Sequence, residues 1–135
     1  MNYILMSIKP QYANLIKAGE KTVELRKVIP KLTGDDILVI YESSPVKKVT
    51  AYCEIDRVSE MNPEELWYAI GEDAKVSREF FESYFKERER AFGIYLKNVY
   101  MLNSPMDLYQ IQNGLTAPQN FRYLTKEQFD IIKNQ

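Results

Sequence analysis

Apolar and polar residues alternate at the start of the chain, where Ile4, Met6 and Ile8 fall on one side of an extended segment at residues 3–8. A hydrophobic period of two predicts a β-strand with one buried face. Further strands are predicted by the same pattern, or by short apolar runs between turn residues, at residues 21–28, 35–41, 49–58 and 91–102.

Helices are predicted where apolar residues recur every three or four positions behind a capping residue or a proline. Pro10 fits the first position of a helix that ends at Gly19. Asn62, Ser77 and Thr125 each precede a further helical pattern. The predicted order is therefore β-α-β-β-β-α-α-β-α.

The short connections between the middle strands favour an α+β fold, with a mostly antiparallel, strongly curved sheet or small barrel and peripheral helices. Residues 105–111 are interpreted as a turn or short helix and residues 118–124 as an irregular segment. Alternating βαβ units and glycine-rich phosphate loops are absent, which argues against dinucleotide-binding and P-loop folds. We expect one domain over residues 1–135.

The composition excludes several kinds of chemistry. The 135 residues include no histidine and one cysteine, Cys53, so catalysis and metal sites that depend on imidazole are excluded, as are an internal disulfide and a four-cysteine zinc site. We expect no metal and no cofactor. The net charge of −1 divides into +3 for residues 1–50, −5 for residues 51–90 and +1 for residues 91–135. This distribution disfavours broad coating of nucleic acid and leaves room for a local anion-binding cleft.

No segment approaches the roughly 18 consecutive apolar residues of a membrane span. Residues 1–10 also lack the basic region and the small-residue cleavage site of a signal peptide. From these features we expect a cytoplasmic protein with no membrane partner.

The candidate chemistry is densest at residues 19–27, GEKTVELRK. On a strand, Glu24 and Arg26 would share one face about 6.6 Å apart, while Val23 and Leu25 would face the core. This pair could jointly hold a planar polar ligand, and Lys21 could reach a phosphate or act as a base if burial lowers its pKa. The alternative is a solvated ion pair on an edge strand, contributing less than about 1 kcal/mol.

The sequence resembles the ASCH domain family. The resemblance begins with ILMSIKPQYA at residues 4–13 and is most specific at residues 19–27, where G-x-K-x-x-E-x-R is matched. It continues from Gly34-Asp35 through the strand to Tyr41, and ends with PQNFRYL at residues 118–124.

This resemblance implies a PUA-like fold, a small curved β-barrel of about five or six strands with peripheral helices. It also implies a cleft beside the barrel, lined by Lys21, Glu24 and Arg26, and a role with RNA or a nucleotide-like small molecule. Some small relatives are amidohydrolases of N4-acetylcytidine that use a lysine and a threonine three residues later. This chain departs from that pattern, because Glu24 stands where the threonine would be.

Four further residues are candidate ligand contacts. Lys9 lies on the outward face of the first strand, Tyr41 could stack on a base, Ser43 could donate to a phosphate, and Arg122 could close over the cleft. Packing, turn formation or solvation explains each of them as well. Aromatic residues at helical spacing are interpreted as core packing; they are Phe80, Phe81, Tyr84 and Phe85.

The sequence favours a binding module for RNA or a nucleotide-like ligand, with Lys9 and Lys21 on phosphate and Glu24 and Arg26 on base edges. One alternative is a metal-independent hydrolase of a modified nucleoside or of RNA, in which Lys21 and Glu24 transfer protons. Another is an interaction protein in which the motif is only structural.

Overall fold

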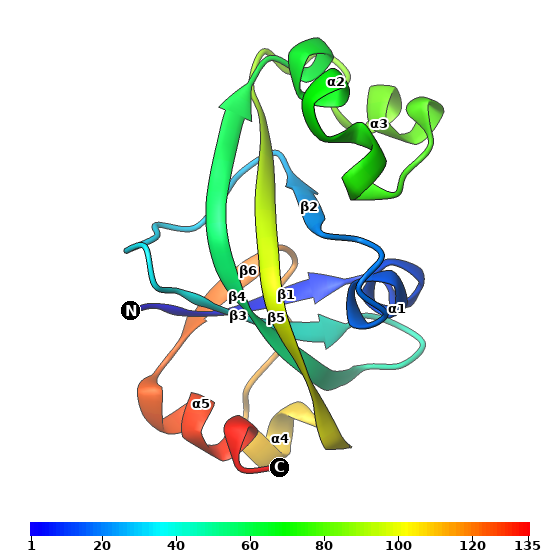
Figure 1. Ribbon diagram of the computed structural model, residues 1–135. Helices are drawn as coiled ribbons and strands as arrows, with labels where there is room; N and C mark the ends of the chain where they lie inside the picture. Colours follow the sequence, from blue (N-terminus) through cyan, green and yellow to red (C-terminus); the bar gives the residue numbers. More distant parts are fainter.

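Six strands form one mixed sheet in the computed structural model, which describes residues 1–135 (Figure 1). The strands are β1 (Tyr3–Ile8), β2 (Val23–Arg26), β3 (Ile37–Glu42), β4 (Lys48–Met61), β5 (Ala91–Met106) and β6 (Phe121–Leu124). The helices are α1 (Pro10–Lys17), α2 (Pro63–Ala74), α3 (Arg78–Tyr84), α4 (Leu108–Ile111) and α5 (Lys126–Lys133). The strand order is β2-β5-β4-β3-β1-β6, in which only β1 and β3 run parallel. The expected α+β fold with peripheral helices is confirmed.

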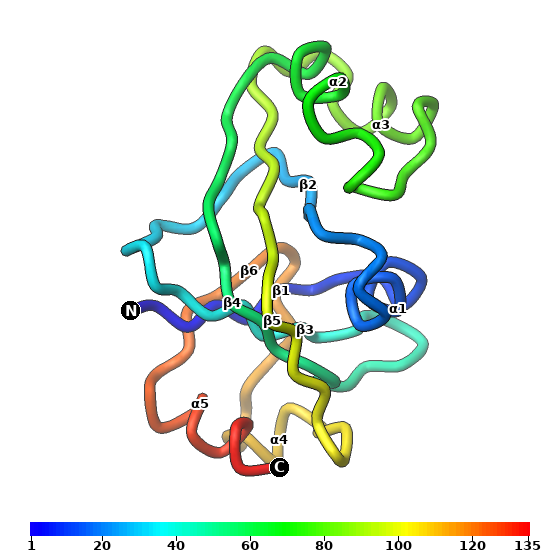
Figure 2. Tube along the Cα trace, viewed as in Figure 1, coloured from blue at the N-terminus to red at the C-terminus, as the bar shows by residue number.

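Strands β4 and β5 are longer than their patterns predicted, with 14 and 16 residues. They run side by side as a ribbon through the molecule, with α2 and α3 at one end and α4 and α5 towards the other (Figure 2). Strand β2 pairs with β5 of this ribbon. The ribbon therefore places α2 and α3 close to β2.

The helix boundaries follow the predicted capping residues. Asn62 accepts a hydrogen bond from the Glu65 amide at 2.9 Å, and Ser77 accepts one from the Phe80 amide at 3.0 Å. These bonds satisfy donors that the first turn of a helix leaves unpaired. After α1 the chain turns at Gly19, whose φ of +78° favours a residue without a Cβ.

The prediction of an irregular segment at residues 118–124 is wrong, because Phe121–Leu124 form β6 and pair antiparallel with β1. This strand is only four residues long, and Arg122 and Tyr123 within it are exposed. No period-two pattern marks so short a strand. Its partner lies more than a hundred positions earlier in the sequence, so local sequence carries no sign of the pairing.

The sheet is strongly curved. Its edge strands β2 and β6 are not paired with each other. Even so, Arg26 of β2 donates a hydrogen bond to the Ser7 carbonyl in β1 and another to the Asn120 side chain just before β6, both at 2.8 Å. One side chain can span these strands only because the sheet curls back on itself.

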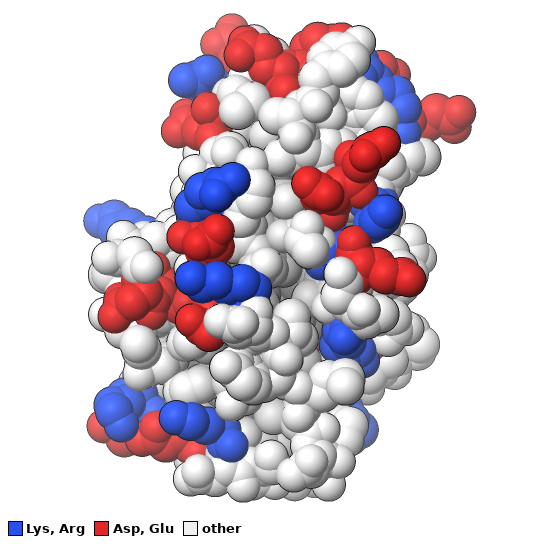
Figure 3. Space-filling view, in the orientation of Figure 1, with Lys and Arg blue, Asp and Glu red and all other residues white.

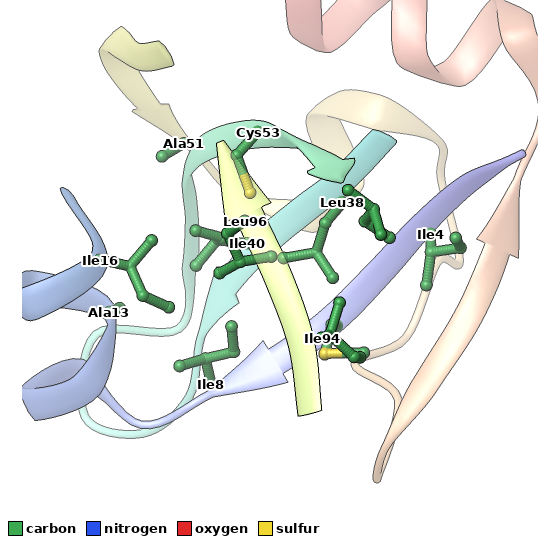
Figure 4. Close-up of a cluster of buried hydrophobic side chains, with 12 residues drawn as sticks. Ile4, Ile8, Ala13, Ile16, Leu38, Ile40, Ala51, Cys53, Ile94 and Leu96 are labelled. Atoms are coloured by element: carbon green, nitrogen blue, oxygen red, sulfur yellow. The ribbon is translucent and has the colours of Figure 1, made fainter. Parts of the chain in front are cut away.

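The main core lies between the curved sheet and α1. Ile4, Ile8, Leu38 and Ile40 of the neighbouring strands β1 and β3 belong to the same buried cluster as Ile16 of α1 (Figure 4). A second cluster packs beneath α4 and α5, and a third joins Val23 and Leu25 of β2 to α2 and α3. The buried aliphatic side chains each contribute about 1.5–3 kcal/mol to folding.

The longest helix, α2, has 12 residues, and no helix combines the length and the hydrophobicity that crossing a bilayer requires.

Candidate functional site

Strand β2 carries the charged motif on the face opposite its packing residues. Val23 and Leu25 pack against α2 and α3, as the alternation predicts. Glu24 and Arg26 point the other way, and they are nevertheless buried, with exposed fractions of 7% and 9%. The solvated ion pair that was the alternative interpretation is therefore ruled out by the burial of both partners.

The three motif side chains form one ionic network. Glu24 Oε2 accepts hydrogen bonds from Arg26 Nε at 3.0 Å and from Arg26 Nη2 at 2.7 Å. Glu24 Oε1 lies 3.8 Å from Lys21 Nζ. Lys21 also donates to the carbonyl of Ala74, which links the network to the end of α2. Burial lowers the pKa of Lys21, while the neighbouring Glu24 carboxylate opposes part of that effect.

This network forms the floor of a small pocket, here called the motif pocket, with a volume of about 150 Å³. Its walls include Tyr12 of α1 and the pair Phe80 and Tyr84 of α3. The Phe80 ring stacks on Tyr84 with centroids 5.7 Å apart and lies 5.8 Å from Tyr12. The pocket is lined by Ser7, Ile8, Lys9, Tyr12, Lys21, Glu24, Leu25, Arg26, Val76, Phe80 and Tyr84.

The aromatic walls were missed in the sequence, where the four aromatics of α3 were assigned to the core together. Phe81 and Phe85 are indeed core residues, each 2% exposed. Phe80 and Tyr84 form a second i,i+4 pair shifted by one position, and this pair is only half-buried. The shift was the available signal, because it turns this pair about 100° around the helix axis from Phe81 and Phe85, towards the edge of the core-facing stripe.

A second depression adjoins the motif pocket and is here called the lysine groove. Its volume is about 390 Å³, and its lining residues are Ser7, Lys9, Tyr41, Ser43, Ser44, Lys47, Ala117, Pro118 and Gln119. Ser7 and Lys9 line both cavities, so the two lie side by side. The side chains of Lys9 and Lys47 are exposed and form no ion pair, and no carboxylate lines the groove.

Tyr41 reaches the lysine groove from β3 with most of its ring buried, at 6% exposure. Burial raises the pKa of its phenol, and the Asp107 carboxylate adds to that effect. The hydroxyl therefore stays protonated at neutral pH and can donate a hydrogen bond.

The structure brings together most of the residues that the sequence singled out. Lys9, Lys21, Glu24 and Arg26 line the motif pocket, and Lys9 lines the lysine groove with two more candidates, Tyr41 and Ser43. Arg122 is not among them. Its side chain is exposed on β6 and bonds weakly to the Thr116 carbonyl at 3.4 Å.

Two polar residues of the site were missed in the sequence. Lys47 lines the lysine groove, and Asn120 bonds to Arg26. Both lie in connecting segments, where no periodic pattern shows which way a side chain faces.

The face of the molecule shown in Figure 3 carries no continuous positive patch. Carboxylates gather over α2 and α3, and cations alternate with carboxylates along the ribbon of β4 and β5. Some of these neighbouring charges form ion pairs, such as Lys97 with Asp56 at 3.5 Å and Arg90 with Glu60 at 3.3 Å. A ligand attracted by positive charge has better partners in the unpaired lysines of the groove.

Comparison with known proteins gives a consistent result along the chain. The sequence profile of the ASCH domain matches residues 6–105. An ASCH domain-containing ribonuclease of Zymomonas mobilis is 28% identical over 127 residues, which cover 92% of this chain and 85% of that protein. The crystal structure of ASCH from Zymomonas mobilis superposes with a TM-score of 0.92 at 27% identity, covering 98% of this chain and 94% of the other.

A more partial relative is the large ribosomal subunit protein uL22 of Ureaplasma parvum, which is 26% identical over 122 residues. The match covers 90% of this chain and 39% of that protein, so this chain spans well under half of its length. The N-terminal domain of Staphylothermus marinus McrB shares the fold at a TM-score of 0.65 and 13% identity.

Proposed function

The chain belongs to the ASCH domain family, and on that premise we propose that it binds single-stranded RNA and cleaves it in the lysine groove. The observation that carries the proposal is that the two cavities are neighbours, with Ser7 and Lys9 lining both. One cavity has the size and lining for a base, and the other has unpaired cations for the backbone. The relation to an ASCH domain-containing ribonuclease and to a ribosomal protein supports RNA as the ligand.

The motif pocket suits one unpaired base. A cavity of about 150 Å³ holds a ring the size of benzene, and the volume here is about 150 Å³. Phe80 and Tyr84 offer aromatic faces, and stacking contributes about 1–3 kcal/mol per base. On the floor, Glu24 Oε1 is an acceptor and Lys21 Nζ a donor, so a base edge can be matched by both kinds of hydrogen bond.

The lysine groove suits the adjoining phosphodiester. In cleavage, the ribose 2′-oxygen bonds to phosphorus and the bond to the 5′-oxygen breaks. The proton lost by the 2′-hydroxyl is balanced by one gained at the 5′-oxygen, which leaves a 2′,3′-cyclic phosphate and a 5′-hydroxyl. Lys9 and Lys47 would stabilise the negative charge that develops on the phosphate oxygens, and the protonated Tyr41 hydroxyl would donate to them.

A second candidate function, hydrolysis of a modified nucleoside in the motif pocket, is favoured by the lowered pKa of Lys21. Against it, Glu24 is held by two bonds from Arg26, and the Ser7 hydroxyl is committed to the Pro118 carbonyl at 2.6 Å. Neither side chain is free to attack an acyl carbon. RNA cleavage makes use of both cavities and is therefore the better-supported proposal.

The test is cleavage of labelled single-stranded RNA by the wild type, by Lys47→Ala and by the matched control Lys31→Ala, whose lysine is exposed outside both cavities. We expect Lys47→Ala to slow cleavage at least about tenfold, a loss typical of removing one charge-stabilising group. The control should cleave at the wild-type rate. Activity should persist in EDTA, because no carboxylate lines the groove to hold a cation.

The proposal is contradicted if the wild type cleaves no RNA, or if Lys47→Ala and the control behave alike. A parallel incubation with acylated nucleosides separates the second candidate function. Turnover there without RNA cleavage would favour the nucleoside hydrolase.

A further inference from the structure

The hydrogen bonds of Arg26 extend beyond the motif pocket. Nε and Nη2 hold Glu24, but Nη2 also donates to the Ser7 carbonyl at 2.8 Å and Nη1 donates to Asn120 Oδ1 at 2.8 Å. These four bonds occupy most of the five donors of a guanidinium. Arg26 thus has little capacity left to bind a base edge or a phosphate.

Asn120 directly follows residues 117–119, which form one wall of the lysine groove. This segment belongs to no helix or strand, so its position depends on a few specific bonds. Ser7 contributes two of them: its hydroxyl donates to the Pro118 carbonyl at 2.6 Å, and its amide donates to the Asn120 carbonyl at 3.2 Å. The bond from Arg26 to the Asn120 side chain is the one that connects this wall to the ionic network of the motif pocket.

We infer that Arg26 and Asn120 are a positioning pair, which joins the floor of the motif pocket to the wall of the lysine groove and touches no substrate atom. The inference rests on the proposed function. It states that the rate of RNA cleavage depends on the bond between Arg26 and Asn120. Orientation acts on the reaction more than on affinity, since a misplacement of about 1 Å costs about 100-fold in rate. The lysines that attract the backbone, Lys9 and Lys47, do not depend on this bond.

The test separates turnover from binding in the variants Asn120→Ala and Asn120→Asp. Aspartate keeps an oxygen that can accept from Arg26, and alanine does not. The matched control is Asn113→Ala, which changes an exposed asparagine outside both cavities. For each protein we would measure kcat on a single-stranded RNA and Kd for the 2′-O-methyl form of the same RNA, which cannot be cleaved by its own 2′-oxygen.

We expect Asn120→Ala to lower kcat about 10- to 100-fold with less than about a twofold change in Kd. Asn120→Asp should restore most of the rate, and Asn113→Ala should match the wild type. Equal losses of binding and turnover in Asn120→Ala would show that Asn120 contacts RNA, and this would overturn the inference. So would a wild-type kcat in Asn120→Ala, or an Asn120→Asp variant as slow as the alanine variant.

If Asn120→Ala does not fold, Asn120→Ser gives the decision, because its shorter side chain stays polar and loses the amide oxygen that accepts from Arg26. A loss of kcat well beyond the loss of binding supports the inference, and an unchanged kcat overturns it. A wild type without cleavage or RNA binding overturns the proposed function and this inference with it. Failure of the inference alone leaves the activity of the wild type intact.

Discussion

The motif pocket and the lysine groove share Ser7 and Lys9, yet they hold their charges in opposite ways. In the pocket, Lys21 and Arg26 are 3% and 9% exposed and share the Glu24 carboxylate between them. In the groove, Lys9 and Lys47 are exposed and carry no partner. Buried charges that bond to one another hold their side chains in one arrangement. Unpaired lysines at the surface attract an anion but do not hold it in a single position.

This difference separates what stabilises the protein from what attracts its ligand. A buried ion loses much of its hydration, so each member of the pocket network depends on the others for compensation. The exposed lysines keep their hydration and contribute little to folding. Substitutions in the two cavities should therefore have different consequences for stability and for binding.

The largest expected effect is on stability. Glu24→Gln removes the only carboxylate between Lys21 and Arg26 and leaves two buried cations uncompensated. We expect the free energy of unfolding to fall by about 3–5 kcal/mol, measured by urea denaturation. Glu20→Gln, an exposed position in the same segment, and Lys47→Ala in the groove should each change it by less than about 0.5 kcal/mol. A comparable loss in all three variants would remove the distinction between the cavities.

The second effect is on binding. Phe80→Ala removes a half-buried wall of the motif pocket and should weaken binding of 2′-O-methyl RNA by about 1–3 kcal/mol, the contribution of one stacked base. Tyr68→Ala is the matched control, because Tyr68 is 76% exposed on the neighbouring α2 and lines neither cavity. Titration by fluorescence anisotropy measures both. If the two variants bind alike, the aromatic walls do not hold a base.

A smaller effect concerns salt. Each phosphate neutralised on a single strand contributes about −0.7 to the slope of log affinity against log salt concentration. Lys9→Ala should make the slope shallower by about that amount, and Lys31→Ala should leave it unchanged. Titrations at several salt concentrations give the slope. An unchanged slope in Lys9→Ala would mean that this lysine meets no phosphate.

The smallest effect is a dependence of stability on pH. Burial lowers the pKa of Lys21 below its ordinary value of 10.5, so between the lowered pKa and 10.5 the unfolded chain binds more protons than the folded one. The free energy of unfolding therefore rises with pH across that window, and this contribution is flat below it. In urea denaturation at a series of pH values, the wild type should gain stability relative to Lys21→Met across the window. A difference in unfolding free energy that stays constant with pH would contradict this, because it would show that the ammonium of Lys21 is solvated in the folded protein.

The motif pocket was accessible to sequence reasoning because its floor is contiguous. Glu24 and Arg26 alternate with core residues on one short strand, and that spacing alone places them together. The sequence could not show that both are buried, since their burial depends on α3 and on the curl of the sheet. The sequence pattern also assigned the four aromatics at residues 80–85 to the core together, and the structure shows that they are divided between the core and the pocket.

The lysine groove was only partly predictable, because its residues come from segments far apart in the chain. Ser43 and Lys47 follow β3, while Pro118 and Gln119 precede β6. They meet because β3 and β6 flank β1 on its two sides. The resemblance at residues 118–124 pointed to this segment, but Arg122 was selected there and not Asn120, since only the pairing register shows which side chain turns inwards.

The most direct test of the central claim, that the two cavities form one RNA site, is an amide chemical-shift map of the wild type with a 2′-O-methyl RNA oligonucleotide. The account predicts the largest shifts in both cavities together, at Lys21 and Glu24 as well as at Ser43 and Lys47. The face beneath α5 should remain unchanged. Shifts confined to one cavity, or centred on α5, would contradict it.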